Sequence, residues 1–418
     1  MDCFCSTALL FFRSLALLGV VFFESLCATA CDAASEVVPL SGERFAAELT
    51  SIDAEGRVHF GPSRVLAIGD MVRLGHPVEA RPQPIVLVHD GSRLIAAAAW
   101  AGAAPVAFSG DEFIVKSDLV KDVRLARRHV AGVIFAERNH PAQRRALEKA
   151  IRELSAAGRE HDEVLLTNDD RMRGKVTAIA DGMLTVATES GAAKLPLSRI
   201  QSVAFANSKI TESMSRGKLK VALRDGSILR ASSVIADDKS LRIQLALSSS
   251  VLEGGTVSGI AALQSMTGER LAYLSDLEPA SFRHVPYLSI EWPYNRDRNA
   301  RGDILTAGGN RYLKGIGMHS AARLTFSLDA AAAWQRFEAN AAVDDSAGGR
   351  GSVTFAVYVQ RGGQWQPAYT SGIVRGGEKP IDVSVDVSGA TGLTLTVDYA
   401  DRGDELDHAD WLDARLVK

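Results

Sequence analysis

Short apolar runs alternate with single polar residues over much of the chain. Between Val37 and about Leu263 the alternation has a period of two, for example at residues 57–60, 184–187 and 241–245. A period of two places successive side chains on opposite faces of a strand, so that one face can be buried. Gly and Asp interrupt the runs at short intervals, which is typical of turns. The pattern predicts a mainly β region of many short strands.

A loose repeat divides this region. Similar turns open three units, at residues 90–94, 169–174 and 225–229. Apolar segments close the same units, at residues 130–135, 200–205 and 257–263. Residues 43–74 resemble a fourth, degenerate copy. Because one hairpin unit cannot bury its apolar face alone, such units stack on their neighbours. We therefore predict β repeat regions at 37–136 and 161–268.

The repeat units faintly resemble small Sm-like or SH3-like barrels, and we expect an array of small β-barrel-like or hairpin repeats. One irregular β domain is the alternative to this array. An array of this kind would serve as a scaffold or as a surface for protein partners.

One segment has a helical pattern instead. Pro141 suits the first turn of a helix, where its missing N–H is not needed. The apolar residues that follow at helical spacing are Leu147, Ala150, Ile151 and Leu154. The spacing predicts an amphipathic helix inserted at 139–160. Such a stripe could contact a membrane or a partner, but it more often packs on its own domain.

The last third of the chain again alternates. Residues 353–359, 381–387 and 393–397 have strand periodicity, and Gly-rich turns at 349–351 and 376–377 bound them. Many short antiparallel strands without intervening helices indicate a β-sandwich. A ligand would then bind at the loops at the ends of the sandwich.

Several motifs in this segment occur together in a characteristic order. They are YLSDL at 273–277, YLKGIGMH at 312–319, GSVTFAV at 351–357, LTLTV at 393–397 and DHADW at 407–411. Their order and spacing resemble the NPCBM/NEW2 family of carbohydrate-binding modules, which are galactose-binding-like β-sandwiches of the jelly-roll type. The resemblance implies a carbohydrate-binding sandwich over residues 271–418. It departs from the family after His319, where Ser320-Ala321-Ala322 replaces the usual Ala-x-Ser.

A sugar site needs a flat apolar face for the C–H side of the ring and planar polar groups for its hydroxyls. The segment contains both kinds of residue, including His408 and Trp411. The residues that we predict to bind carbohydrate are Trp292, His319, Asp344, Asp345 and Asp410. Trp292 is the expected aromatic platform, because Pro293 prevents regular strand pairing around it.

Each of these residues also has a structural interpretation. Trp411 fits a core position within a strand, and His319 fits a buried structural histidine. Asp344 and Asp345 fit a solvated turn. The same two carboxylates could instead bind calcium, which prefers oxygen ligands. The sequence makes no cofactor certain.

The first thirty residues have the pattern of a signal peptide. Apolar runs precede the small residues at 28–30, a suitable cleavage site, and we expect export to the periplasm, cell surface or medium. The four cysteines lie at positions 3, 5, 27 and 31. We therefore expect a mature protein without an internal disulfide. Lipidation of Cys31 would tether it to a membrane.

Composition excludes some classes of protein. The formal net charge is −3 and no basic block occurs, which argues against a nucleic-acid partner. Hydrophobic residues make up 46% and charged residues 23% of the chain, which is typical of a globular protein.

The sequence favours an exported, non-catalytic glycan-binding protein over an enzyme. A TIM barrel is excluded because β–α alternation is missing, and no HExxH, GxSxG or P-loop motif occurs. Two alternatives stay open. One is an envelope protein that makes structural or protein contacts, and the other is the accessory module of an unrecognised glycoside hydrolase.

Overall fold

The computed structural model describes residues 34–98, 105–135, 141–156, 158–206, 217–247, 250–287 and 289–418. The leader, Cys31 and residues 139–140 lie outside these ranges. The fold is mainly β, with 53% of the described residues in strands, as the sequence predicted. Within the described ranges, no helix is both long and apolar enough to span a membrane.

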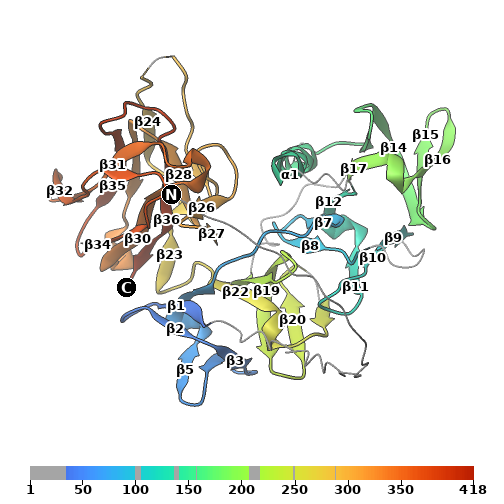
Figure 1. Ribbon diagram of the computed structural model, residues 1–418, viewed down its shortest axis with the longest axis horizontal. Coiled ribbons are helices and arrows are strands. Elements are labelled where there is room, and N and C mark those ends of the chain that lie inside the picture. Colours follow the sequence, from blue (N-terminus) through green and yellow to red (C-terminus); the bar gives the residue numbers. More distant parts are fainter. Residues whose placement is uncertain are drawn as a thin grey trace, which may run out of the picture. The chain divides into compact units, whose positions relative to one another are not determined.

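The N-terminal strands form four similar groups, which we call repeats one to four (Figure 1). Repeat one contains β1 (Ser35–Pro39), β2 (Phe45–Ala47), β3 (Leu49–Ile52), β4 (Arg57–Phe60), β5 (Arg64–Ala67) and β6 (Met71–Gly75). Repeat two contains β7 (Ile85–Val88), β8 (Arg93–Ile95), β9 (Val106–Ser109), β10 (Glu112–Val115), β11 (Val123–Ala126) and β12 (Val130–Ile134).

Repeats three and four are shorter by one strand. Repeat three contains β13 (Asp162–Leu166), β14 (Arg171–Ala180), β15 (Met183–Thr188), β16 (Gly191–Pro196) and β17 (Ile200–Ala204). Repeat four contains β18 (Leu219–Leu223), β19 (Ile228–Ala236), β20 (Leu241–Leu245), β21 (Val251–Glu253) and β22 (Ile260–Ser265). In every repeat a three-residue 3-10 turn directly precedes the last strand. The three turns noted in the sequence connect β7 to β8, β13 to β14 and β18 to β19.

The repeats associate in pairs through their last strands. In repeats one and four β6 pairs with β22, and in repeats two and three β12 pairs with β17. Both contacts require glycine, because a Cβ at Gly75 would collide with the carbonyl oxygen of Ala261 and one at Gly132 with that of Val203. Further strand pairings join the two pairs of repeats to each other. All 22 strands therefore belong to one hydrogen-bonded network over a shared apolar core. Each repeat therefore buries its apolar face against others.

The predicted helix is present as α1 (Pro141–Ala156). Ile151 is 2% exposed and packs in a small cluster with Ile85, Ile134 and Ala204. Leu147 and Leu154 pack against the same cluster. The apolar stripe thus covers the sheet of its own region.

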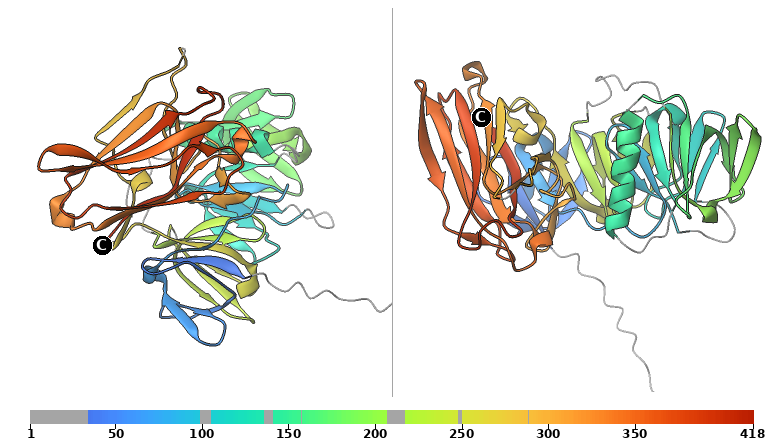
Figure 2. Two further views of the ribbon diagram at one scale, coloured as in Figure 1. Left: turned by 60° about the vertical axis from the view of Figure 1, so that its left-hand side comes forward. Right: turned by 90° about the horizontal axis from the view of Figure 1, so that it is seen from above.

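The C-terminal segment is a sandwich of two six-stranded sheets, drawn in orange and red in Figure 2. One sheet contains β23 (Leu271–Tyr273), β25 (Asn295–Arg296), β28 (Gly315–His319), β30 (Arg336–Val343), β34 (Ile381–Asp386) and β36 (His408–Val417). The other contains β24 (Ser281–His284), β29 (Ala322–Ser327), β31 (Ser352–Arg361), β32 (Gln364–Thr370), β33 (Val374–Arg375) and β35 (Gly392–Tyr399). A hairpin of β26 (Leu305–Ala307) and β27 (Asn310–Tyr312) forms a separate two-stranded sheet that packs against Ala342 and Leu412 of the first sheet.

Alternating side chains of the two sheets form the core of the sandwich. Trp411 is 0% exposed, and its indole packs edge-on against Phe355 and Phe337, with ring centroids 5.0 and 6.1 Å apart. Trp411 is therefore a core residue, as expected from its position in a strand pattern.

A buried polar network crosses the boundary near residue 271. Arg73 Nε of β6 donates to Asp413 Oδ2 of β36 at 2.8 Å, and these residues are 3% and 1% exposed. Gln264 Nε2 donates to the hydroxyl of Tyr273 at 2.6 Å and to Asp413 Oδ1 at 3.2 Å. Buried hydrogen bonds thus connect the last strands of repeats one and four to the sandwich.

Candidate functional site

A cavity of about 350 Å³ opens where β28 ends and β36 begins. Its lining residues are Ile290, Trp292, Arg301, His319, Asp404, Leu406 and His408. His319 and His408 are the end residues of neighbouring strands and lie directly opposite each other in the antiparallel register. Two strands of the rigid sandwich therefore fix both imidazoles, while loops supply the other residues.

Stacked rings form the wall of this cavity. The indole of Trp292 lies 4.6 Å from the imidazole of His319, and the two planes differ by 10°. The Trp292 and His408 rings lie 5.9 Å apart. The backbone N–H of Trp292 donates to Nδ1 of His284 at 3.3 Å. The loop that carries the indole is thus attached to β24 and stacked on β28.

Hydrogen bonds identify the nitrogen of His319 that carries a proton, whereas the hydroxyl beside His408 can donate or accept. Nδ1 of His319 lies 3.1 Å from the carbonyl oxygen of Ser320, and that oxygen also accepts from Nε2 of His284 at 2.9 Å. A carbonyl oxygen only accepts, so Nδ1 of His319 carries the proton and its Nε2 is an acceptor. Nδ1 of His408 lies 3.0 Å from the hydroxyl of Ser346.

Burial keeps these imidazoles uncharged at neutral pH. It lowers the pKa of His319, which is 4% exposed. Burial and the neighbouring His319 lower the pKa of His408 to about 4. A neutral imidazole offers one donor and one acceptor, which is the combination that a sugar hydroxyl can use.

Two charged side chains face the same cavity. Arg301 and Asp404 both line it. Among the described residues, neither has an oppositely charged partner within salt-bridge distance. Both side chains therefore keep hydrogen-bonding capacity for a ligand.

The structure places Asp344 away from this cavity. Asp344 is 0% exposed, and its carboxylate accepts hydrogen bonds from the backbone N–H and hydroxyl of Thr306 at 2.8 and 3.0 Å. It also accepts from Nδ2 of Asn299 at 3.0 Å and from the backbone N–H of Ser346 at 2.9 Å. Its acceptor sites are thus occupied by the loops that it holds in place.

Asp345 and Asp410 also lie outside the cavity lining. Asp345 accepts from the backbone N–H groups of Gly308 and Gly309 at 3.0 and 2.9 Å, and so fixes the turn between β26 and β27. Asp410 is 0% exposed, and burial beside the Asp344 carboxylate raises its pKa well above the ordinary range. Neither carboxylate oxygen of Asp410 has a hydrogen-bond partner among the described residues, so the site favours the uncharged acid and offers no contact to a ligand in the cavity.

The cavity thus contains Trp292 and His319 of the five predicted residues, and not the three carboxylates. Sequence reasoning did not single out Arg301 or Asp404, because an isolated charge in a loop has no periodicity that marks it. Among the described residues, no cluster of three or more His, Cys, Asp or Glu side chains could hold a metal ion. The calcium hypothesis for Asp344 and Asp345 has no support from this geometry.

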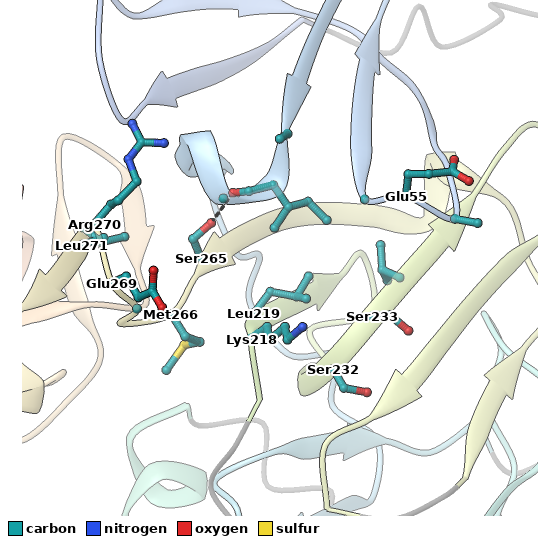
Figure 3. A pocket seen from close by; sticks show the side chains of 17 residues that line it. Glu55, Lys218, Leu219, Ser232, Ser233, Ser265, Met266, Glu269, Arg270 and Leu271 are labelled. Atoms are coloured by element: carbon teal, nitrogen blue, oxygen red, sulfur yellow. Dashed lines mark hydrogen bonds between the residues drawn. The ribbon is translucent and has the colours of Figure 1, made fainter. Parts of the chain in front are cut away.

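A second cavity, of about 560 Å³, lies between repeats one and four (Figure 3). The hydroxyl of Ser265 donates to the carbonyl oxygen of Ile68 at 2.8 Å. Ser232 Oγ bonds the carbonyl oxygen of Gln244 at 3.4 Å, and Arg270 pairs with Asp70. These polar groups have internal partners, and none of the predicted site residues lies here.

Comparison with known proteins agrees with the geometry of the sandwich. Residues 270–417 match the NPCBM/NEW2 domain, so the C-terminal third of the chain is such a domain. The chain is 33% identical over 119 residues to alpha-1,3-galactosidase B of Akkermansia muciniphila. That match covers 28% of this chain and 14% of the enzyme.

Similar solved structures include carbohydrate-binding modules of Clostridium perfringens. One is CBM51 from GH95 in complex with methyl-galactose, which is 27% identical over 35% of this chain and 99% of that chain, with a TM-score of 0.31. Another is CBM51-2 in complex with GlcNAc and INT domains from ZmpB, which is 20% identical over 56% of this chain and 43% of that chain, with a TM-score of 0.31.

Proposed function

We propose that this protein binds glycans through its NPCBM/NEW2 domain, in the cavity lined by Trp292, His319 and His408. The observation that carries the proposal is the combination of a fixed aromatic ring, two neutral imidazoles and two unpaired charges around one cavity. Its volume of about 350 Å³ lies in the range of small-ligand sites.

Different residues of the cavity would contact different parts of a sugar ring. The part of the Trp292 indole that His319 leaves uncovered would contact the C–H face of the ring. The neutral imidazole of His408 would exchange hydrogen bonds with a hydroxyl. Arg301 would donate to hydroxyl oxygens and Asp404 would accept from hydroxyl groups, and charged partners make such bonds stronger.

An exposed apolar rim beside the cavity favours a glycan longer than one residue. Ile290 lines the cavity and is 67% exposed. Tyr287, three residues earlier, is 60% exposed, and its ring lies 5.9 Å from that of Tyr399, which is 47% exposed. Exposed aromatic rings can stack on further sugar residues.

The proposed role is binding without catalysis. Glycoside hydrolysis commonly uses two carboxylates that flank the scissile bond. Asp404 is the single carboxylate among the residues that line this cavity. The chain spans 14% of the length of the similar galactosidase, and that enzyme's activity is not proposed for it. The repeats would then act as a spacer or a surface for protein partners.

We further propose that the protein is exported, because residues 1–30 have the pattern of a signal peptide. Mass spectrometry of the N-terminus of protein from its native host tests this. Cleavage before Cys31 supports export, a lipid on Cys31 adds a membrane tether, and an uncleaved Met1 contradicts the proposal.

A glycan array tests the binding function directly. The wild-type chain should bind a defined set of glycans, and Trp292→Ala should lose them while melting at the wild-type temperature. Trp365→Ala is the matched control, because Trp365 is an exposed tryptophan, at 43%, that lies on β32 outside the cavity lining. Equal binding by wild type and Trp292→Ala would place the site elsewhere.

A further inference from the structure

A separate cavity of about 450 Å³ lies between α1, β8 and the residues that follow β25. None of the residues that line the Trp292 cavity lines this one. Its walls are unusually rich in arginine. Three of these arginines come from different elements: Arg93 from β8, Arg152 from α1 and Arg298 from the loop after β25.

Two of these guanidinium groups have spare donors. Arg152 Nη2 donates to the carbonyl oxygen of Gly91 at 3.3 Å, while its Nε–H is buried without an acceptor. Arg298 Nη1 donates to the carbonyl oxygen of Asp297 at 3.1 Å. Among the described residues, no carboxylate lies within salt-bridge distance of Arg152 or Arg298. A buried donor without a partner is costly, and an added acceptor would remove that cost.

The remaining charges of the cavity largely neutralise one another. Arg145 pairs with Asp303 at 2.9 Å, Lys149 with Glu153 at 3.9 Å and Lys220 with Asp297 at 3.6 Å. Glu148 lies 3.6 Å from Nη1 of Arg93. Asp90 also faces the cavity and accepts from the backbone N–H of Ser92 at 2.8 Å. Arg296 also lines the cavity and pairs with Glu278 at 2.6 Å, and Arg230, a further lining residue, is engaged as well. Arg152 and Arg298 are therefore the arginines of this cavity that have no carboxylate within salt-bridge distance among the described residues.

These arginines repel one another across the cavity. Burial lowers the pKa of Arg93 and of Arg152, and the charge of Arg298 lowers both further. Guanidinium groups that line one cleft and feel each other's charge attract anions. Their planar forks suit two-point contact with carboxylate, sulfate or phosphate groups.

We infer that this cavity is a second binding site, for a small ligand with a carboxylate, sulfate or phosphate group, held by Arg152 and Arg298. The ligand's anionic group accepts hydrogen bonds from both guanidinium groups, including the Nε–H of Arg152. The cavity is large enough for one or two sugar rings, so an acidic saccharide fits as well as an inorganic anion.

Calorimetric titration of the full chain tests the site. The probes are glucuronate, inorganic sulfate and inorganic phosphate, with glucose as the uncharged counterpart of glucuronate. At low ionic strength at least one anion should bind saturably, more weakly at high salt, and glucose should not bind at this site. Tighter binding of glucuronate identifies an acidic saccharide, whereas binding of sulfate or phosphate alone identifies the inorganic anion.

Substitutions assign the binding to the cavity. Arg298→Ala should weaken it about tenfold or more, because one charge-assisted contact is lost. Arg152→Gln should have a similar effect, and melting curves verify that both variants fold. Arg124→Ala is the matched control, since the side chain of Arg124 is 62% exposed and lies outside the cavity.

Two results would overturn the inference. One is that no anion binds saturably, and the other is that Arg298→Ala binds anions as tightly as Arg124→Ala does. The outcome is independent of the proposed glycan site. Trp292→Ala should leave anion binding unchanged, and Arg298→Ala should leave the binding of neutral glycans unchanged.

Discussion

The indole of Trp292 stacks face to face on the imidazole of His319, with ring centroids 4.6 Å apart and 10° between their planes. This stack connects a loop residue to the end of β28. We therefore expect His319 to have two roles, because it supports the indole and would offer a ring nitrogen to the ligand.

Two substitutions of His319 separate these roles. His319→Phe keeps an aromatic support but removes the ring nitrogens, and should cost about 1 kcal/mol of glycan-binding free energy. His319→Ala also removes the support of Trp292 and should cost more, about 2–3 kcal/mol. Calorimetry with a glycan from the array measures both. Equal losses would mean that the stack does not position the indole.

The pH dependence of glycan binding should follow His408. Its pKa is lowered to about 4, so the ring stays neutral well below the ordinary histidine value of 6.5. Affinity should be constant from neutral pH down to about pH 5 and fall only as His408 gains a proton near pH 4. A fall in affinity with a midpoint near pH 6.5 would contradict a buried, neutral His408.

Asp407 should make the folded state less stable above about pH 6. Burial raises its pKa from 3.8 to about 6, so between these values the folded state binds a proton that the unfolded chain has lost. The stability that this proton provides, about 3 kcal/mol at most, is lost as the pH rises through about 6.

The variant Asp407→Asn cannot ionise, and its amide oxygen can still accept from the backbone N–H of Ser352. Relative to wild type, it should gain stability as the pH rises from about 4 to about 6, and the gain should then stay constant. Thermal melting at several pH values between 4 and 8 measures the difference. If the difference in stability between the two proteins does not change with pH, Asp407 does not have a raised pKa in the folded state.

Asp344 and Asp410 should respond differently to substitution although both are fully buried. Burial beside Asp344 raises the pKa of Asp410, so Asp410→Asn, which keeps the side-chain shape without a charge, should change stability by less than about 1 kcal/mol. Asp344→Ala leaves Thr306, Asn299 and Ser346 donors without an acceptor, and should cost about 3–5 kcal/mol. Urea unfolding compares the two. A large loss for Asp410→Asn would mean that Asp410 carries a charge.

Much of the sandwich could be predicted from sequence because its signals are local. Strand periodicity and the ordered motifs identified the fold, and Trp411 fitted a buried position. The motifs also led to Trp292 and His319. They led equally to Asp344 and Asp410, because a carboxylate that holds a loop and one that binds a ligand look the same in sequence.

Other features depend on contacts between distant residues. The ion pair of Arg73 with Asp413 joins positions far apart in the chain, and no periodicity indicates it. Likewise, the pairing of β6 with β22 brings repeats one and four together although two repeats separate them in sequence. Arg93, Arg152 and Arg298, which line the cavity beside α1, come from separate elements, so only the fold brings them together.

The central claim is that saccharides bind against Trp292, and its indole N–H resonance in a ¹⁵N-correlated NMR spectrum reports on this directly. The spectrum is recorded on the full chain during titration with methyl-galactoside, N-acetylglucosamine or a glycan from the array, and Trp292→Phe assigns the signal. We predict a saturable shift of the Trp292 indole, while the indole of the core residue Trp411 stays in place. If no saccharide shifts the Trp292 signal, or if the exposed Trp365 responds instead, the proposed site is wrong.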